Sequence, residues 1–244
     1  MYRDIAVGKP GTLTRVGIGT FVDPRIEGGK INKQTTEDLV EVITISGEEM
    51  LFYKTYKVDV AIIRGTLADA DGNISMEKEA LRIDNLSQAM AAKNSGGVVI
   101  TQLERIVPAK TLSPGMVEVP SAMIDAIVLA KPENYVQTYG TVYSAYLDGQ
   151  DRAPSKKIKM TPLDARKVIA RRTALELPFD GGVVNLGIGV PEGVAMVASE
   201  QNWLEAVTLT AEPGFIGGQL SSGLDFGTAV NTDVIITQSQ QFDF

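Results

Sequence analysis

The sequence predicts an α/β fold built of open, mostly parallel sheets with flanking helices. Two patterns support this prediction. Short runs rich in β-branched residues alternate with helix-like stretches, and turn signals rich in glycine and proline separate them. The composition agrees, because 44% hydrophobic and 22% charged residues are typical of a globular chain. A chain of 244 residues is long enough for one large domain or two small ones.

The first half is expected to contain three strands and one helix. Strands are predicted over residues 58–63, 98–101 and 126–130, because each is a short apolar run bounded by turn signals. The first of them is expected to end at Arg64. A helix is predicted over residues 79–94, since a pair of glycines follows it as a stop signal.

The second half begins with a polar stretch and then resumes the same alternation. Residues 133–159 are polar, rich in tyrosine and aperiodic, which indicates an ordered linker. This linker would join a first domain, residues 1–132, to a second domain, residues 160–244. Beyond it we predict strands over residues 183–186, 206–210 and 234–237 and a helix over residues 191–201.

Another helix is expected at the start of the second domain. Thr161 is a suitable N-cap and Pro162 suits the first turn. The apolar side of this helix is expected to face inward and its basic side outward. The inward set is Ala165, Val168, Ile169, Thr173 and Leu175, and the outward set is Arg166, Lys167, Arg171 and Arg172.

Two residue types are absent from the sequence, and their absence excludes several chemistries. Without cysteine there is no disulfide, no thiol nucleophile and no cysteine-ligated zinc. Without histidine there is no Ser-His-Asp triad, no histidine-ligated metal and no imidazole acid or base. No Asp/Glu cluster has the spacing of a calcium loop, so no metal site is predicted.

Charge and hydropathy narrow the function further. With 23 Lys+Arg against 30 Asp+Glu, the net charge is −7, which disfavours non-specific binding to nucleic acid or to anionic membranes. Apolar runs such as residues 126–130 are far too short to span a bilayer, and the first residues have no signal-peptide pattern. We therefore expect a cytoplasmic protein that binds neither nucleic acid nor membrane.

The first motif of chemical interest is a glycine-rich turn at residues 185–193 (NLGIGVPEG). It follows a predicted strand and opens a predicted helix, and Gly187, Gly189 and Pro191 lie in it. Glycines let the backbone approach a ligand closely, and a helix N-terminus offers unpaired N–H groups to a phosphate or carboxylate. The spacing fits neither the dinucleotide motif nor a P-loop, and the same pattern is also typical of a tight turn without a ligand.

The second motif is residues 208–218 (TLTAEPGFIGG), which places Glu212 where a strand runs out into a glycine-rich loop. A carboxylate at the carboxyl end of a strand is well placed for a nucleophile or a general base. Gly214, Gly217 and Gly218 allow backbone N–H groups to point at a developing oxyanion. A solvated glutamate at a strand end remains the alternative.

Two more segments contain polar residues beside predicted turns. In residues 64–73 (RGTLADADGN), the Asp-Gly-Asn sequence is expected to form only a turn, and Arg64 to form a structural ion pair. In the glycine-rich residues 17–30, Phe21, Asp23 and Arg25 would either line a pocket or stabilise the loop.

With these motifs together, the chain resembles the family I CoA-transferases. The pair GIGVPEGVA and LTAEPGFIGG carries the resemblance, and the segments TFVDPRIEGGKIN, LFYKTYKVDVAIIRGTLADADGNISME and ARRTALEL extend it over essentially the whole chain. Within that family the chain is similar to the fused acetate/propionate/acetoacetate type of acyl-CoA:carboxylate CoA-transferase.

The resemblance implies a reaction and a site. It implies transfer of CoA between a short-chain acyl-CoA and a carboxylic acid, by a ping-pong mechanism through a glutamyl-CoA thioester. The family nucleophile corresponds to Glu212. The substrate- and CoA-binding positions correspond to Gly187, Gly189, Pro191, Gly214, Gly217 and Gly218. Coenzyme A would be a substrate, with no tightly bound cofactor and no metal.

The resemblance also implies two related CoA-transferase-type domains, each incomplete, because fused members of the family are about twice as long. The chain then corresponds to the end of the first domain and the start of the second. A homo-oligomer, or a complementary chain that supplies the remaining segments, is the expected assembly. The alternatives are a fragment that only binds CoA or assembles with a partner, and a related CoA-ester hydrolase.

Overall fold

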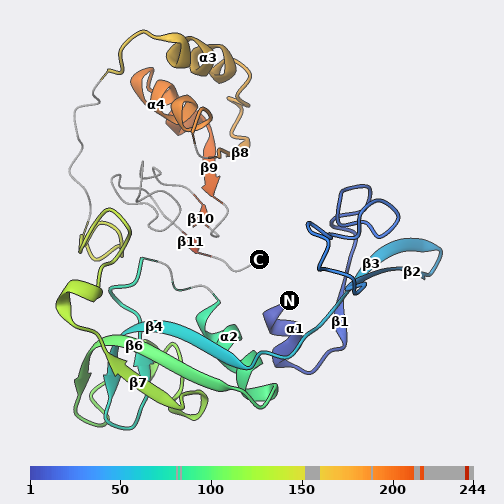
Figure 1. Cartoon of the computed structure of the whole chain (residues 1–244). Helices are drawn as coiled ribbons and strands as arrows, with labels where there is room; N and C mark the ends of the chain where they lie inside the picture. The colour runs from blue at the N-terminus through green and yellow to red at the C-terminus, as the bar shows by residue number, and fades with distance from the viewer. Residues whose placement is uncertain are drawn as a thin grey trace. The chain divides into compact units, whose positions relative to one another are not determined.

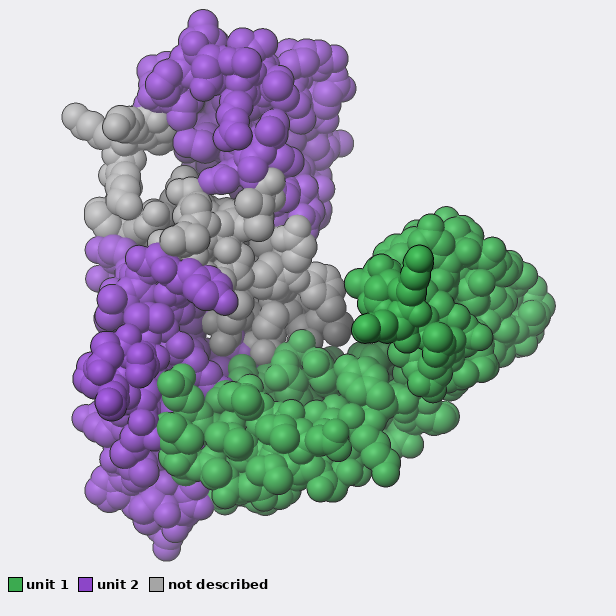
Figure 2. All heavy atoms as spheres, viewed as in Figure 1, with its two compact units in different colours: residues 1–63, 84–102, 119–128 green, residues 64–83, 103–118, 129–244 purple. Residues whose placement is uncertain are grey.

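The computed structural model of the chain describes residues 1–80, 82, 84–151, 160–187, 189–211, 215–216 and 240–241. The chain divides into two compact units (Figure 2). The first unit consists of residues 1–63, 84–102 and 119–128, and the second of residues 64–83, 103–118 and 129–244.

Both halves contain helices and strands, and β1 to β5 follow one another in the first half without a helix between them (Figure 1). The α-helices are α1 Tyr2–Ala6, α2 Asn85–Asn94, α3 Ala165–Ala174 and α4 Glu192–Glu200. The strands are β1 Gly11–Thr14, β2 Val40–Ile45, β3 Glu48–Lys54, β4 Val60–Asp69, β5 Ile74–Ser75, β6 Val98–Val107, β7 Ala126–Leu129, β8 Val183–Asn185, β9 Thr208–Ala211, β10 Phe215–Ile216 and β11 Gln240–Gln241. Short 3₁₀ turns cover Pro114–Met116, Ser121–Met123, Pro132–Asn134 and Leu204–Ala206.

Within the described residues these strands form three sheets, with the orders β1-β3-β2, β5-β4-β6-β7 and β11-β10-β9-β8. Strands β8 and β9 are parallel, whereas β9–β10, β10–β11 and β4–β5 are antiparallel. The predicted α/β class, with sheets accompanied by helices, is confirmed.

The sheet β1-β3-β2 is fully antiparallel and was not predicted from the sequence. Its centre is the hairpin of β2 and β3, in which Ile45 pairs with Glu48. The two residues between them, Ser46 and Gly47, have φ angles of 53° and 85°. Two positive φ angles in a two-residue loop match the right-handed twist of a hairpin, and a Ser-Gly pair between apolar runs is its signal.

Strand β4 runs six residues beyond the predicted end at residue 63. Gly65 does not stop the strand but belongs to it, because a Cβ there would collide with Ile74 Cγ2 on the paired strand β5 and lie 3.0 Å from the Ser75 carbonyl oxygen. The glycine therefore permits close pairing. The turn after β4 is stabilised as expected, since the Asp69 carboxylate accepts hydrogen bonds from the Asn73 backbone and side chain.

The helix expected over residues 79–94 begins only at Asn85. Its N-cap, Asp84, has a left-handed φ of 64°, which marks a change of direction before the helix. The Glu79 backbone N–H instead closes a turn onto the Met76 carbonyl at 3.1 Å, and its side chain is buried in an ion pair with Arg64. Tertiary pairing has here replaced the local helical preference.

In the second half, β8, α4 and β9 lie within two residues of their predicted ranges. The strand predicted over residues 234–237 lies outside the described residues. The core between these elements joins two helices to two strands. Its buried members are Ala170, Ala174, Leu186, Val194, Val197, Val207 and Leu209.

Helix α3 differs from its prediction in both its start and its orientation. Its N-cap is Asp164, whose carboxylate accepts a 2.8 Å hydrogen bond from the Lys167 backbone N–H, and not Thr161. The buried residues are Lys167, Ala170 and Ala174, while Val168 and Leu175 are exposed. The predicted inward face was therefore wrong. In the predicted outward set Arg166, Arg171 and Arg172 are exposed as expected, and only Lys167 is buried.

Residues 133–151 fold against the β4–β5 region through hydrogen bonds to its backbone. Gln137 Nε2 donates to the Lys78 carbonyl at 2.9 Å, and Gln150 Nε2 to the Glu77 carbonyl at 3.0 Å. The Lys78 ammonium lies 5.4 Å from the ring centre of Tyr143. The boundaries at residues 132 and 159 stay predictions.

We predict that Gly65→Val destabilises the protein, because its side chain would collide with Ile74 and the β5 backbone. The expected loss is about 1–3 kcal/mol in the free energy of unfolding, typical of overpacking. Urea unfolding followed by circular dichroism measures it. Gly115→Ala is the control, since a Cβ at Gly115 meets nothing within 4 Å. Equal stability of the two variants would contradict the proposed role of Gly65.

Candidate functional site

The glycine-rich turn of the sequence is a strand-to-helix turn in the structure. Strand β8 ends at Asn185, the core residue Leu186 follows, and α4 begins at Glu192 with Pro191 as its N-cap. Gly189 has a φ of 91°, which a side chain would strain. A Cβ at Gly187 or Gly189 would meet nothing within 4 Å, so the backbone here is open to a ligand.

This turn lies at one end of a parallel strand pair. In the register of β8 and β9, Asn185 pairs with Thr210, so the two carboxyl ends meet at the same edge. Strand β9 ends at Ala211. In open α/β sheets, ligands bind at this edge. The predicted site residues that follow in sequence, Glu212, Gly214, Gly217 and Gly218, lie outside the described residues.

A hollow of about 240 Å³ lies beside the turn. Gly189 and Glu192 line it from the turn and α4, and Arg166 and Lys167 line it from α3. The remaining lining residues are Thr161, Pro162, Asp164, Val190, Gly193, Met196 and Val197. The structure thus brings Gly189 together with Arg166 and Lys167, which the sequence analysis had predicted only as part of an outward helix face. The other two turn residues predicted for the site, Gly187 and Pro191, do not line the hollow.

A buried ion pair holds this part of the structure together. The Lys167 ammonium lies 2.7 Å from Glu200 Oε2, and the two side chains are 5% and 1% exposed. Lys167 also donates to the Thr161 carbonyl at 2.6 Å. Glu200 Oε1 accepts from the Thr161 backbone N–H at 2.6 Å and from its hydroxyl at 2.8 Å. The pair therefore joins α3, α4 and the segment before α3.

These contacts shift the ionisation of Glu200. The hydrogen bond from Lys167, followed by the bonds from Thr161, lowers the pKa of the Glu200 carboxyl from 4.5 to about 2. The folded state thus favours the carboxylate. No pattern of spacing in the sequence distinguishes Lys167 from the other basic residues of α3, so only the packing reveals its role.

The loop with Asp23 and Arg25 has a structural role. Asp23 is buried and accepts hydrogen bonds from the Gly19 and Arg25 backbone N–H groups and from the Arg25 guanidinium. These hydrogen bonds lower the pKa of the Asp23 carboxyl, and the bond from the Arg25 side chain has the largest effect. Arg25 also pairs with Glu49 at 2.8 Å. Asp23 and Arg25 therefore stabilise their loop, which is one of the two roles expected from the sequence.

Arg64 is likewise part of a structural cluster. Its Nε lies 3.0 Å from Glu79 Oε2, and its guanidinium carbon lies 4.3 Å from the ring centre of Tyr135. The Tyr135 hydroxyl lies 2.6 Å from Glu79 Oε1, and burial, then Glu79, raises the pKa of this hydroxyl. The structural ion pair expected at Arg64 is confirmed.

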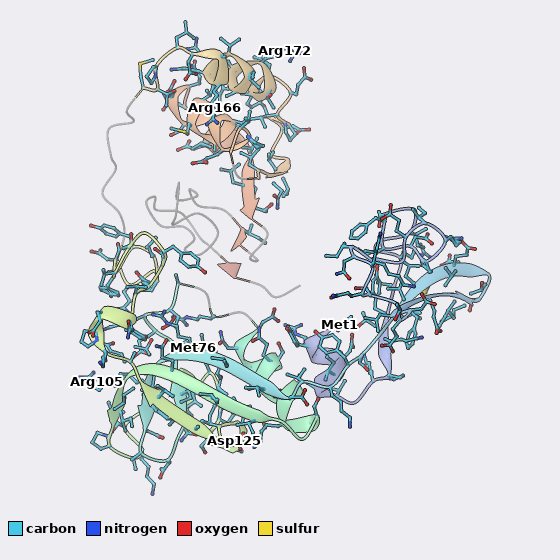
Figure 3. All side chains as sticks on the ribbon, in the orientation of Figure 1. Met1, Met76, Arg105, Asp125, Arg166 and Arg172 are labelled. Atoms are coloured by element: carbon cyan, nitrogen blue, oxygen red, sulfur yellow. The ribbon has the colours of Figure 1, made fainter. Side chains whose placement is uncertain are left out.

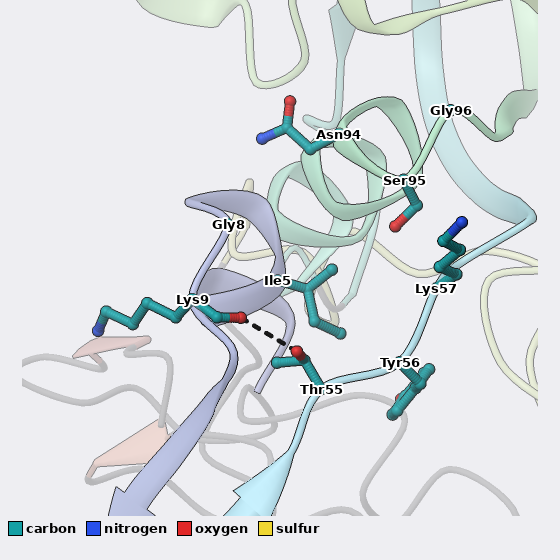
Figure 4. A pocket seen from close by; sticks show the side chains of 9 residues that line it. All are labelled: Ile5, Gly8, Lys9, Thr55, Tyr56, Lys57, Asn94, Ser95 and Gly96. Atoms are coloured by element: carbon teal, nitrogen blue, oxygen red, sulfur yellow. Dashed lines mark hydrogen bonds between the residues drawn. The ribbon is translucent and has the colours of Figure 1, made fainter.

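A second hollow lies in the first unit, around the end of α2 (Figure 4). Its volume is about 430 Å³. Its lining residues are Ile5, Gly8, Lys9, Thr55, Tyr56, Lys57, Asn94, Ser95 and Gly96. The Thr55 hydroxyl donates to the Lys9 carbonyl at 3.0 Å across it. None of the predicted site residues that the structure describes lines this hollow.

Two kinds of feature are absent from the residues that the structure describes. No helix among them is long and apolar enough to cross a membrane. The same described residues contain no group of three or more His, Cys, Asp or Glu side chains arranged to hold a metal ion.

Comparison with known proteins identifies the family. The family model described as Coenzyme A transferase matches residues 5–130. The chain belongs to the coenzyme A transferase family. The family predicted from the glycine turn and the Glu212 segment is therefore confirmed.

Two curated relatives match almost the whole chain. Caffeate CoA-transferase of Acetobacterium woodii is 48% identical over 244 residues, which is 100% of this chain and 46% of the relative. Acetate CoA-transferase YdiF of Escherichia coli K12 is 38% identical over 242 residues, 99% of this chain and 45% of the relative. The chain thus spans about half the length of the curated relatives it matches.

Two solved structures also match nearly the whole chain. The apoenzyme of the acyl-CoA transferase YdiF from E. coli O157:H7 matches with a TM-score of 0.82 and 35% identity, over 95% of this chain and 44% of that chain. The same protein, described as a thioester complex with CoA, matches with a TM-score of 0.81, over 95% of this chain and 46% of that chain.

We predict that Glu200→Gln lowers stability by about 3 kcal/mol at neutral pH, because it leaves the buried Lys167 without its charge partner. The folded pKa of Glu200 is depressed, so its contribution is complete above pH 4.5 and disappears as the pH falls through about 2. The difference between the two proteins should narrow over that interval. Urea unfolding at a series of pH values measures it.

Glu176→Gln is the matched control for this experiment. Glu176 pairs with Arg172 at 2.5 Å, but both side chains are about two-thirds exposed, at 68% and 67%. An exposed pair of this kind contributes only about 0–1 kcal/mol. A stability difference for Glu200→Gln that stayed constant from pH 5 to about pH 2 would contradict the assignment.

Proposed function

We propose that the chain takes part in the transfer of CoA between an acyl-CoA and a carboxylic acid. The observation that carries this proposal is its 48% identity, over all 244 residues, to a protein named caffeate CoA-transferase. The match to the YdiF protein described as a thioester complex with CoA supports a covalent route. The glycine turn at the carboxyl edge of β8 and β9 supports a site in the second half of the chain.

We assign Glu212 as the nucleophile. Its carboxylate oxygen attacks the acyl carbon of the thioester, the C–S bond breaks, and an acyl-glutamyl anhydride forms as the CoA thiolate leaves. The thiolate then attacks the Glu212 carbonyl carbon and releases the acyl group as a carboxylate. The product is a glutamyl-CoA thioester. An acceptor carboxylate reverses these two steps and frees Glu212.

No step of this cycle requires a proton, a metal or a thiol from the protein, which fits a sequence without histidine and cysteine. Gly187 and Gly189 would bind the substrate through open backbone groups, and Pro191, which has no backbone N–H, would contact it from the start of α4. Gly214, Gly217 and Gly218 would direct backbone N–H groups at the oxyanion of each tetrahedral intermediate. Binding energy from the long CoA molecule would support the reaction at Glu212.

The domain organisation follows from the same proposal. Residues 1–132 would be the end of a first CoA-transferase domain, residues 133–159 the linker, and residues 160–244 the start of a second domain with the nucleophile. The family match, which ends at residue 130, supports the first boundary. Because the chain spans about half of its relatives, complete activity would require the rest of the transferase or a homo-oligomer that completes the site.

Two classes of acyl group are suggested by the names of the relatives. The relatives are named for caffeate, an aromatic acid, and for acetate, a short-chain acid. We propose a short-chain carboxylate, and a panel of acceptor acids that includes both would decide. A single methylene contributes only about 1–3 kcal/mol of discrimination, so the panel should span chain length as well as aromaticity.

A second candidate is a CoA-binding or assembly module without turnover. The half-length coverage favours it, since segments that relatives carry elsewhere would be missing from the site. Binding of CoA without transfer, both alone and together with the rest of the transferase, would support this alternative. Loss of the thioester to water without an acceptor would indicate a CoA-ester hydrolase.

We predict that Glu212→Gln lowers CoA transfer by about three orders of magnitude or more while CoA binding changes little, because only the anionic nucleophile is lost. Borohydride reduction after addition of acyl-CoA should convert the Glu212 carboxyl to a hydroxymethyl group, which mass spectrometry detects. Glu212→Asp should fail as well, since it withdraws the carboxylate by about 1 Å.

Glu205→Gln is the control, because Glu205 is an exposed carboxylate seven residues earlier. Near-normal transfer by Glu212→Gln in an active assembly would show that another carboxylate is the nucleophile. Absence of the reduced residue from an active assembly would argue against the covalent route.

A further inference from the structure

Helix α3 turns its most apolar side outward, which is unusual for a helix in a globular unit. Val168, Ile169 and Leu175 are 56%, 50% and 61% exposed, and Ala165 is exposed as well. At 100° per residue, Ala165, Val168, Ile169, Arg172 and Leu175 share one face of the helix. We refer to these five residues as the outer face of α3.

The inward side of α3 explains why this orientation is stable. Its small residues Ala170 and Ala174 let α4 approach closely, and a Cβ at Gly193 would lie 3.3 Å from the Ala170 side chain. The buried pair of Lys167 and Glu200 fixes the rotation of the helix. Turning the apolar side inward would break this pair and leave a buried charge unpaired. The outer face is therefore a consequence of α3–α4 packing.

The chain itself leaves this face uncovered among the described residues. Leu163 and Met160, which precede α3, are also exposed, at 71% and 67%. An exposed apolar surface of this kind marks a contact with another polypeptide segment. Figure 3 shows Arg172 on the side of α3 that faces away from α4.

We propose that the outer face of α3 docks against the part of the transferase that the relatives carry beyond the stretch matched by this chain. More than half of each relative lies beyond that stretch, because the matched region covers 46% and 45% of the two relatives. The fold of this chain is nevertheless shared with the longer YdiF protein at a TM-score of 0.82. Among the possible occupants of the outer face, this additional region is the one that the comparisons indicate.

The charge at the edge of the outer face indicates what the occupant presents there. Arg171 and Arg172 lie in the last turn of α3. Arg172 pairs with Glu176, whereas Arg171 has no ion-pair partner among the described residues. We therefore infer that the occupant presents an apolar surface with carboxylates at its edge. This inference rests on family membership and not on the proposed reaction.

Single cysteines test the proposal cleanly, because the sequence contains none. Val168→Cys and Leu175→Cys would be introduced into the chain alone, and into a graft in which these 244 residues replace the matched region of the A. woodii relative. Maleimide labelling, resolved by peptide mass spectrometry, gives the rate at each position. Lys33→Cys, at an exposed polar position in the first unit, is the control.

In the chain alone, all three cysteines should react at rates typical of exposed thiols. In the graft, the two α3 cysteines should react about tenfold or more slowly, since a covered thiol reacts only after local opening. Lys33→Cys should keep its rate. Equal labelling of the α3 cysteines in the chain and the graft would overturn the proposal.

A second copy is tested in the same samples. If protection of Val168→Cys in the chain alone rises with protein concentration in step with dimer mass, the occupant is another copy and the proposal is wrong. The double variant Val168→Glu/Leu175→Glu gives an independent readout. It should leave the unfolding midpoint of the isolated chain unchanged and lower that of the graft, and an unchanged graft would also count against the proposal.

Discussion

The buried ion pair between Lys167 and Glu200 fixes how α3 and α4 pack against each other in the second unit. One charge comes from α3 and the other from the last residue of α4, and both also bind Thr161. Such a pair adds little net stability compared with an apolar contact, but a rotation of either helix would leave a charge buried and unpaired. It therefore specifies one orientation of α3, and with it the position of the turn that begins α4.

The consequences of this constraint extend to both surfaces of α3. On the inward side, alanines at positions 170 and 174 let the helices approach, and the hollow lined by Gly189 and Arg166 forms between the turn and α3. On the other side, the apolar residues are left exposed. The hollow beside the glycine-rich turn and the outer face of α3 thus both result from the way α3 packs against α4.

Charged and hydroxyl side chains organise the loops of the chain in a similar way. Asp23 binds its own loop through the Arg25 guanidinium, Asp69 closes the turn after β4, and Glu79 joins Arg64 to Tyr135. Each carboxylate is buried, and each has hydrogen-bond partners that replace the water it has lost. These contacts explain polar motifs that in sequence resemble parts of a binding site.

The sequence by itself determined the α/β class, the strand-to-helix turn at Gly189 and the family, because periodicity, glycine chemistry and a specific motif pair are local properties. It did not determine the start of α2, the end of β4 or the inward face of α3. Each of these three features depends on a tertiary contact. The first involves the ion pair of Glu79 with Arg64, and the second the close approach of Gly65 to Ile74. The third involves the ion pair of Lys167 with Glu200. Each partner lies at least nine residues away in sequence, so only the tertiary structure decided which local preference was overridden.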